Sequence, residues 1–191
     1  REVHKRLEML PSLPTVVMEI MKLVDDDKSS ARDFEEHISH DPALAARILR
    51  IANSSFFAQS RKIKSIRDSI VVLGYRTLKS VVMAASTGAI LNRPAEGYGL
   101  ISGGLWKHSI ACAMGSRLLA SRLGRGEAAA EEFFVQGLLH DIGKILLNTF
   151  LNEKSSQFQE TLTRETPNLL EAEMLIMGTD HCKVGMEIAE Q

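Results

Sequence analysis

The sequence predicts an all-α fold, and three observations carry this prediction. Apolar residues recur every three or four positions along most of the chain, which is the spacing of one face of a helix. Runs in which apolar and polar residues alternate, as in a half-buried strand, are absent. The apolar content comes mainly from Leu, Ile, Ala and Met, with only 5% aromatic residues, and these side chains favour helices.

The composition is that of an ordinary globular protein, with 191 residues, 45% of them hydrophobic and 25% charged. A net charge of −1 disfavours nucleic acid or anionic lipid as a partner. No apolar run is long enough to span a membrane, and no signal peptide precedes the first helix. Cys112 and Cys182 form no CxxC pair, which suits a reducing cytoplasm. Because the chain starts at Arg1 and stops at Gln191 within an apparent helix, we expect it to be part of a longer protein.

Helix-start signals place the N-terminal elements. Ser12–Pro14 predicts the start of a helix that runs to Val24 and ends at Asp25–Asp27, which we interpret as a solvated loop rather than a cation site. Ser30 with Asp33 resembles a capping box, and it predicts a short helix through Ile38. A further helix is expected to begin with Asp41 as N-cap and Pro42 at its first position, and to end at Asn53–Ser55. The pair of short helices over residues 31–53 also allows a helix-turn-helix, but the second has few side chains suited to reading bases.

A basic segment follows the two phenylalanines Phe56 and Phe57, which we expect to pack into the core. Arg61, Lys62 and Lys64 precede a helix capped by Ser65, and such a helix start can receive an anion such as a nucleotide phosphate. A solvated basic loop is the alternative interpretation. That helix is predicted to stop at Gly74, and another is expected over residues 77–90.

The break LNRPAEGYGLISGG is rich in glycine and provides the best domain boundary. We expect an N-terminal helical half over residues 1–91, a connecting loop over 92–104 and a C-terminal helical half over 105–191. A long helix should open the second half and stop at Gly124. It carries His108, with Cys112 one turn later. We expect Cys112 to be a small buried thiol, with a role as a ligand as the alternative.

The stretch FVQGLLHDIGKILL organises this second half. Its apolar spacing predicts a helix from Glu131 to Asp141, so that His140 and Asp141 lie at the edge of the apolar face, where an unpaired charge is costly. A metal ion bound by imidazole and carboxylate would satisfy both residues. The alternative is a histidine that is satisfied by the neighbouring aspartate. Gly143 allows the backbone to bend or approach closely, and Lys144 adds a cation within one turn.

The remaining residues predict further helices, one or two over 145–166 and one from Asn168 to Met177. Gly178 then ends that helix, and Thr179 or Asp180 caps the next one. His181 stands at the start of this last helix. A role as a ligand and a hydrogen bond to Asp180 are both open for His181 at this point.

HDIGK, with an upstream histidine on the preceding helix, resembles the HD superfamily of metal-dependent phosphohydrolases. The motifs LPSLP, HDPAL, RIANS and SIVVLG, together with EMLIMGTDHCKVG, further resemble the HDOD domain from about residue 8 to 191. This resemblance implies an all-α, multi-helix HD-like bundle with an N-terminal helical subdomain. It also implies that His108, His140 and Asp141 bind a divalent metal, with His181 near a second position. Iron, manganese, nickel and zinc suit such mixed nitrogen and oxygen ligands.

The HDOD resemblance implies a bacterial signalling output module that acts by binding a nucleotide-type ligand or a signalling protein. An active phosphohydrolase is the rival reading. In that reading Asp141 would bridge metals or orient water, and Lys144 would neutralise charge on a phosphate ester. Two departures favour the module: no closing aspartate is found before Gln191, and the GYP signature of related phosphodiesterases is missing. A nucleic-acid-binding regulator is a third and weaker reading.

Overall fold

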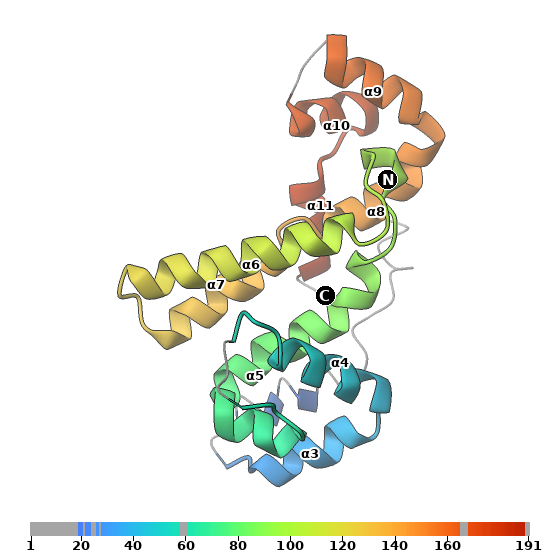
Figure 1. The fold of residues 1–191 in the computed structure, drawn as a ribbon. Helices are drawn as coiled ribbons and strands as arrows, with labels where there is room; N and C mark the ends of the chain where they lie inside the picture. Colours follow the sequence, from blue (N-terminus) through green and yellow to red (C-terminus); the bar gives the residue numbers. More distant parts are fainter. Residues whose placement is uncertain are drawn as a thin grey trace. The chain divides into compact units, whose positions relative to one another are not determined.

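The structure is a computed structural model that describes residues 19–20, 22–23, 26, 28–57, 61–164 and 168–189. These residues form helices joined by short turns (Figure 1). The α-helices are α3 (Ala31–Ser39), α4 (Pro42–Ala52), α5 (Ile66–Leu91), α6 (Gly104–Arg122), α7 (Glu127–Leu139), α8 (Gly143–Leu151), α9 (Ser155–Arg164), α10 (Leu169–Met177) and α11 (His181–Ala189), and the 3-10 helices are η1 (Glu96–Tyr98) and η2 (Asn152–Lys154). No strand occurs in these described ranges, where Ala95 and Leu100 form an isolated bridge. The predicted all-α fold is therefore confirmed.

The chain divides into two compact units. As far as the residues are described, unit 1 contains Ile90–Ala111 and Leu138–Gln191, and unit 2 contains Leu13–Ala89 and Cys112–Gly137. The halves expected from the sequence follow chain order, whereas these units assign residues 112–137 to the N-terminal helices. Packing explains the difference, because the second half of α6 and most of α7 contact helices that precede the glycine-rich loop.

The N-terminal caps of α3 and α4 in unit 2 form as the sequence predicts. The Ser30 hydroxyl and backbone N–H both donate to the Asp33 carboxylate, so α3 begins with the expected capping box. The Asp41 side chain accepts from the backbone of Leu44, and Pro42 occupies the first position of α4. Both helices are amphipathic, and they bury Phe34, Ile38, Leu44, Ile48 and Ala52. These caps fix where each helix presents its apolar face.

Gly74 interrupts α5 as expected. Its backbone has φ 78° and ψ 165°, which is not helical, so α5 consists of two helical segments joined at a kink. A positive φ is costly for residues with a side chain, which accounts for glycine at this point. The second segment is largely buried, and it includes Leu78, Val81, Val82, Ala84 and Ala85.

Close helix packing in unit 2 depends on Gly137 of α7. A Cβ atom there would lie 2.8 Å from the carbonyl oxygen of Cys112 and 2.9 Å from the backbone of Ala113, so α6 and α7 approach at their backbones. The Phe56 ring lies 6.3 Å from the ring of Phe134, which is fully buried. Phe56 therefore packs against the core as expected. Cys112 is only partly buried.

Unit 1 places α8 against α11 and packs α9 with α10 (Figure 1). One apolar cluster joins Leu146 and Leu147 of α8 to Val184 of α11. A second cluster joins Leu151, Phe158 and Ala172, with Tyr98 packed against both. The Asn148 side chain accepts from the backbone of Gly97 and so ties η1 to α8. These contacts hold the elements that position the candidate site.

Several sequence features fall partly or wholly outside the described residues. Residues 19–20 and 22–23 of the first predicted helix are helical, and Ile20 is fully buried. The start of that helix at Ser12–Pro14, the aspartates Asp25 and Asp27, and Thr166–Pro167 lie outside the description. None of the described helices combines the length and the apolar character needed to cross a membrane.

Candidate metal centre

Asp141 is the centre of a cluster of polar side chains in unit 1. Helix α7 ends at Leu139, so His140 and Asp141 lie in the turn before α8. The prediction that α7 extends to Asp141 was therefore wrong by two residues. The turn is closed by hydrogen bonds from the backbone N–H of Ile142 to Leu139 and from that of Lys144 to Asp141. It directs the Asp141 side chain inward, where the residue is only 3% exposed.

Gly143 allows a second helix to approach this turn closely. A Cβ atom at Gly143 would overlap the carbonyl oxygen of His181 and lie 2.7 Å from the backbone nitrogen of Gly185. Only glycine therefore permits α8 and α11 to cross at this separation. The crossing brings His181, the first residue of α11, beside Asp141. The glycine of HDIGK thus has a packing role that bears directly on the site.

Two partly exposed histidines face one oxygen of Asp141. His108 Nε2 and His140 Nε2 each lie 3.4 Å from Asp141 Oδ2. The two Nε2 atoms are 3.2 Å apart. His108 comes from the first turns of α6, and its side chain is 54% exposed, compared with 39% for His140. The site is therefore open to solvent on the side of these two histidines.

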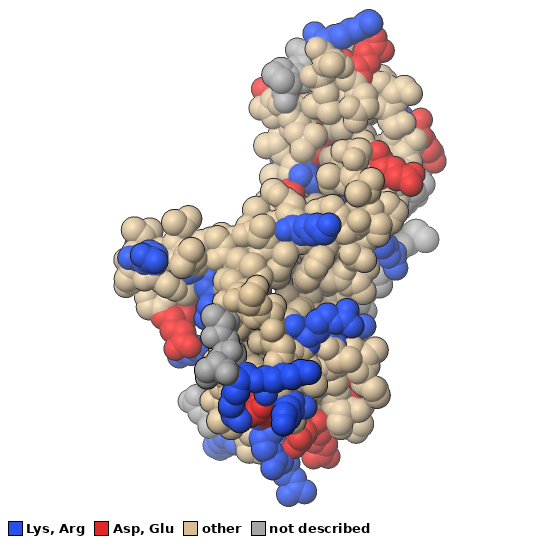
Figure 2. Space-filling view, viewed as in Figure 1, with Lys and Arg blue, Asp and Glu red and all other residues tan. Residues whose placement is uncertain are grey.

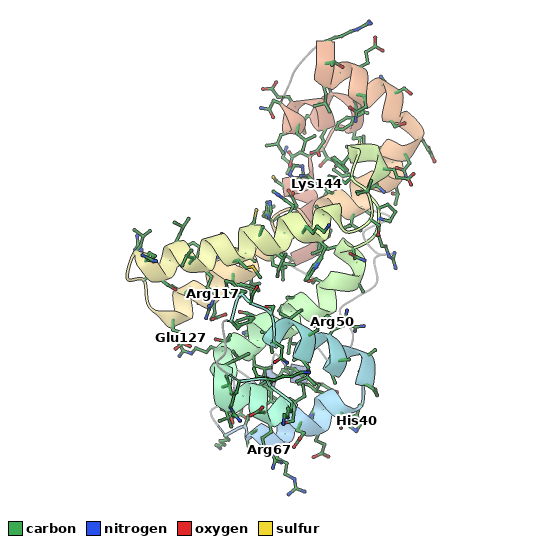
Figure 3. The ribbon with its side chains drawn as sticks, in the orientation of Figure 1. His40, Arg50, Arg67, Arg117, Glu127 and Lys144 are labelled. Atoms are coloured by element: carbon green, nitrogen blue, oxygen red, sulfur yellow. The ribbon has the colours of Figure 1, made fainter. Side chains whose placement is uncertain are left out.

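Lys144 contacts the same carboxylate oxygen. Its Nζ donates to Asp141 Oδ2 at 2.7 Å, and the side chain is mostly buried. The ammonium group also lies 5.8 Å from the centre of the Tyr98 ring, within the range of a cation–π contact. Figure 3 labels Lys144 on α8 in unit 1. The lysine thus supplies positive charge directly at the candidate ligand.

His181 links the other oxygen of Asp141 to a second carboxylate. His181 Nε2 lies 3.3 Å from Asp141 Oδ1. On the opposite edge of the ring, Nδ1 lies 2.7 Å and 2.8 Å from the two oxygens of Glu173. Asp180 instead accepts from the backbone of Lys183 as the N-cap of α11. The His181 side chain therefore contacts Asp141 and Glu173 rather than Asp180, the partner that one interpretation of the sequence gave it.

The pKa values of the cluster follow from burial and opposite charges. Burial raises the pKa of Asp141, but hydrogen bonds from His181 and Lys144 outweigh it and hold that pKa well below its usual range. Burial lowers the pKa of His181, yet hydrogen bonds to Asp141 and Glu173 raise it to about 9. Burial and the Glu173 carboxylate raise the pKa of the Tyr98 hydroxyl, which therefore stays protonated. In the metal-free protein, the cluster balances its carboxylates with a lysine and an imidazolium.

The arrangement fits a divalent metal. Two nitrogens that bind one ion at about 2.1 Å are separated by roughly 3.0–3.4 Å, depending on the coordination geometry. The 3.2 Å between His108 Nε2 and His140 Nε2 lies in this range, and the contacts of 3.4 Å to Asp141 are at its upper limit. Because the two oxygens of Asp141 face different histidines, a second position on the side of His181 is also within reach. Imidazole and carboxylate donors of this kind suit iron, manganese, nickel and zinc.

The predicted anion-binding cluster belongs to unit 2 and has acidic partners of its own chain. Arg61 forms an ion pair of 2.6 Å with Asp68, which also accepts from the backbone of Lys64. Arg67 pairs with Glu35 at 2.8 Å. Figure 2 shows Lys and Arg side chains over α3–α5 with Asp and Glu side chains among them. Lys62 and Lys64 are exposed, and an anion at Arg61 would compete with Asp68.

Sequence reasoning missed Glu173 and Tyr98 as parts of the site. The available signal for Glu173 is its spacing, which puts it on the same side of its helix as the apolar residues Leu169 and Met177. A carboxylate on an apolar face needs a partner, and the histidine eight positions later is that partner. Tyr98 gave no signal, because it lies in the glycine-rich segment that was read as a loop.

Comparison with known protein families matches residues 10–191 to the HDOD domain. The chain belongs to this family, as its motifs had suggested. The match covers both compact units and all of the candidate ligands. Membership of the family accounts for the helical architecture but does not by itself assign a reaction.

Solved structures with similar folds carry different descriptions. A crystal structure of a candidate phosphohydrolase from Shewanella amazonensis SB2B is 27% identical, with a TM-score of 0.79. An HDOD domain protein of unknown function from Geobacter sulfurreducens is 28% identical, also with a TM-score of 0.79. A candidate signal transduction protein from Marinobacter aquaeolei VT8 is 25% identical, with a TM-score of 0.72. These matches cover 98%, 98% and 97% of this chain, which spans 65%, 65% and 41% of those proteins.

Proposed function

We propose that this chain is a signalling output module that binds a divalent metal at His108, His140 and Asp141. A second ion position would be shared by Asp141 and His181. The module would act by binding a nucleotide-type ligand or a partner protein of a signalling pathway. Similarity to a candidate signal transduction protein supports the general role.

The observation that carries the proposal is the convergence of three imidazole Nε2 atoms on one buried carboxylate. Asp141 Oδ2 faces His108 and His140, whereas Oδ1 faces His181. Packing alone does not require three histidines to point the same ring nitrogen at one carboxylate. Neutral imidazole and ionised carboxylate are the usual donors for a catalytic or regulatory transition metal.

Each residue near such an ion would have a different role. Asp141, kept ionised by its neighbours, would supply the negative charge that balances the metal. Lys144 would hold the anionic part of a ligand close to the same carboxylate, since its ammonium group already lies there. The exposed edges of His108 and His140 would leave room for a ligand to approach from solvent. A bound divalent ion would supply Lewis acidity and an acidified water molecule.

Metal content is the direct test. We expect the purified chain, after reconstitution with iron, manganese, nickel or zinc, to retain a near-stoichiometric amount of one of these metals after dialysis. Asp141→Ala and His140→Gln should lose it, whereas the matched variant His40→Gln should keep it, because His40 is an exposed residue of unit 2. Elemental analysis measures this. Absence of metal from the wild type after reconstitution would contradict the proposal.

An active phosphohydrolase is the second candidate. The contact between Lys144 and Asp141 favours it, because a cation beside a metal-binding carboxylate is suited to a phosphate ester. The similarity to a candidate phosphohydrolase supports the same chemistry. Hydrolysis of cyclic dinucleotides and of simple phosphodiesters by the metal-loaded chain would establish it, with Lys144→Met expected to lose turnover but keep metal. Ligand binding without turnover would support the signalling module alone.

A further inference from the structure

Glu173 is a fully buried carboxylate that pairs with His181 and also faces the hydroxyl of Tyr98. It is 0% exposed, and burying a charge without a partner is very costly. The ring nitrogen Nδ1 of His181 contacts both of its oxygens. The backbone N–H of His181 also donates to Oε2 at 2.8 Å. Glu173 therefore holds both the ring and the main chain of one candidate ligand.

The helix start does not require Glu173 as a cap. Helix α10 ends at Gly178, which has a left-handed backbone with φ 71°, and α11 starts three residues later. Asp180 already serves as the N-cap by accepting from the backbone of Lys183 at 2.9 Å. Glu173 is a residue of the preceding helix and reaches across this turn. Its contacts with His181 are thus an addition to ordinary capping.

The chemistry of imidazole gives these contacts a consequence. A neutral imidazole has a single N–H, and the other nitrogen then offers a lone pair. If Nδ1 donates to Glu173, the lone pair lies on Nε2, which faces Asp141 Oδ1 at 3.3 Å. Histidines that bind metals usually donate their other N–H to a carboxylate or a carbonyl, which fixes the tautomer and orients the ring.

We infer that Glu173 is a positioning residue that holds His181 in the Nδ1–H form, so that Nε2 and Asp141 Oδ1 together receive the second metal ion. This inference rests on the proposed metal-binding function. In this role Glu173 would contact neither metal ion directly. Glu173 acts on the ion only through His181, and it leaves the pair His108 and His140 unaffected.

Zinc binding to matched variants tests the inference. Glu173→Gln removes the charge but keeps the size, and Glu171→Gln changes an exposed residue of the same helix. Titration calorimetry with Zn²⁺ alone should show two binding events in the wild type. We expect Glu173→Gln to weaken the event on the His181 side by about 10–100-fold, the usual effect of losing such a partner. The other event should be unchanged, and Glu171→Gln should match the wild type.

The tautomer of His181 is a second readout, independent of metal. Nitrogen-15 NMR of the metal-free chain, at a pH where the ring is neutral, should show the Nδ1–H form in the wild type and a mixture in Glu173→Gln. An Nε2–H form in the wild type would overturn the inference without any variant. Equal weakening of both zinc sites in a folded Glu173→Gln would also overturn it, because the effect would then be general.

The two readouts separate this inference from the function on which it rests. A wild-type chain that binds no zinc but shows the Nδ1–H form, lost in Glu173→Gln, would support the positioning by Glu173 and contradict the metal-binding function. Two zinc ions bound by the wild type and bound equally well by Glu173→Gln would support the function and overturn the positioning role.

Discussion

Each of the two units contains a buried carboxylate that joins segments far apart in the sequence. In unit 1 the acid is Asp141, and in unit 2 it is Glu131 of α7. Glu131 Oε1 accepts from Thr77 at 2.9 Å and from Arg117 Nε at 2.7 Å. The guanidinium of Arg117 also lies 5.5 Å from the centre of the Phe56 ring. Both clusters are polar, both have a buried carboxylate at their centre, and both join separate helices.

The difference lies in what surrounds each acid. Glu131 is paired with a guanidinium, which is always charged and cannot bind a metal, and with a hydroxyl. Asp141 is surrounded by a lysine and by three imidazoles, whose ring nitrogens can bind a metal. Burial of a carboxylate alone therefore does not indicate function. The donors around the carboxylate distinguish a structural cluster from a candidate ligand site.

The largest effect on stability should come from the cluster in unit 2. Arg117→Met would leave Glu131 buried without its cation, and we expect the free energy of unfolding to fall by about 3 kcal/mol. Metal content should not change. Urea unfolding and elemental analysis measure the two quantities. Arg164→Met is the control, because its ion pair with Glu160 is exposed and should contribute less than about 1 kcal/mol. Equal losses in both variants would contradict the structural role of the Glu131 cluster.

A change at Gly143 should damage the site in unit 1 through packing. Gly143→Ala places a Cβ atom against the backbone of His181 and Gly185, so α11 must move away from α8. We expect a loss of about 2–3 kcal/mol in the free energy of unfolding, as is usual for overpacking against backbone. Zinc binding on the His181 side should weaken as well, since that histidine moves with α11. Unchanged stability and unchanged zinc binding would show that the two helices need not be so close.

The pH dependence of stability should distinguish His181 from the permanent charges of unit 2. Its pKa in the folded, metal-free chain is raised to about 9 from an ordinary 6.5. Its contribution is therefore fully present below pH 6.5 and is lost as the pH rises through 9. We expect a decline on the order of 2 kcal/mol in the free energy of unfolding across this window.

His181→Gln should remove most of the fall in the free energy of unfolding with rising pH. Arg117→Met should lower the free energy of unfolding at every pH but leave its dependence on pH unchanged. Denaturant unfolding at a series of pH values, with chelator present, measures both variants. The same decline in His181→Gln as in the wild type would assign the effect to another group.

The smallest expected effect is an increase in the free energy of unfolding. Gly115 lies inside α6, and a Cβ atom there would meet nothing within 4 Å. Gly115→Ala should therefore raise the free energy of unfolding by about 0.5–1 kcal/mol, because alanine favours the helix. Thermal unfolding of Gly115→Ala and Gly143→Ala, the same substitution in two helices, should give shifts of opposite sign. A loss of stability in both would mean that helix propensity does not limit α6.

Local signals predicted much of the fold. Capping by Ser30 and Asp41, the break at Gly74 and the stop at Gly178 depend on a few neighbouring residues, so a single sequence reveals them. The HDIGK motif likewise marked His140 and Asp141. The ligand roles of His108, His140, Asp141 and His181 remain predictions, although the structure brings these four residues together.

Contacts between distant segments could not be predicted in the same way. The pairing of Glu173 with His181 depends on the turn at Gly178, which reverses the chain between α10 and α11. The close approach of α8 to α11 requires glycine at residue 143, but a glycine alone does not say which helix approaches. The same holds for Glu131, whose partner Thr77 lies in α5.

Helix α6 belongs to both units, with His108 in unit 1 and Arg117 in unit 2. Each unit is in turn assembled from separate stretches of chain, so no single cut releases either of them intact. Recombination at one point in a gene would therefore transfer neither unit by itself. The Asp141 and Glu131 clusters would therefore be transferred only together, and a protease that cuts the glycine-rich loop would leave two fragments that each contain parts of both units.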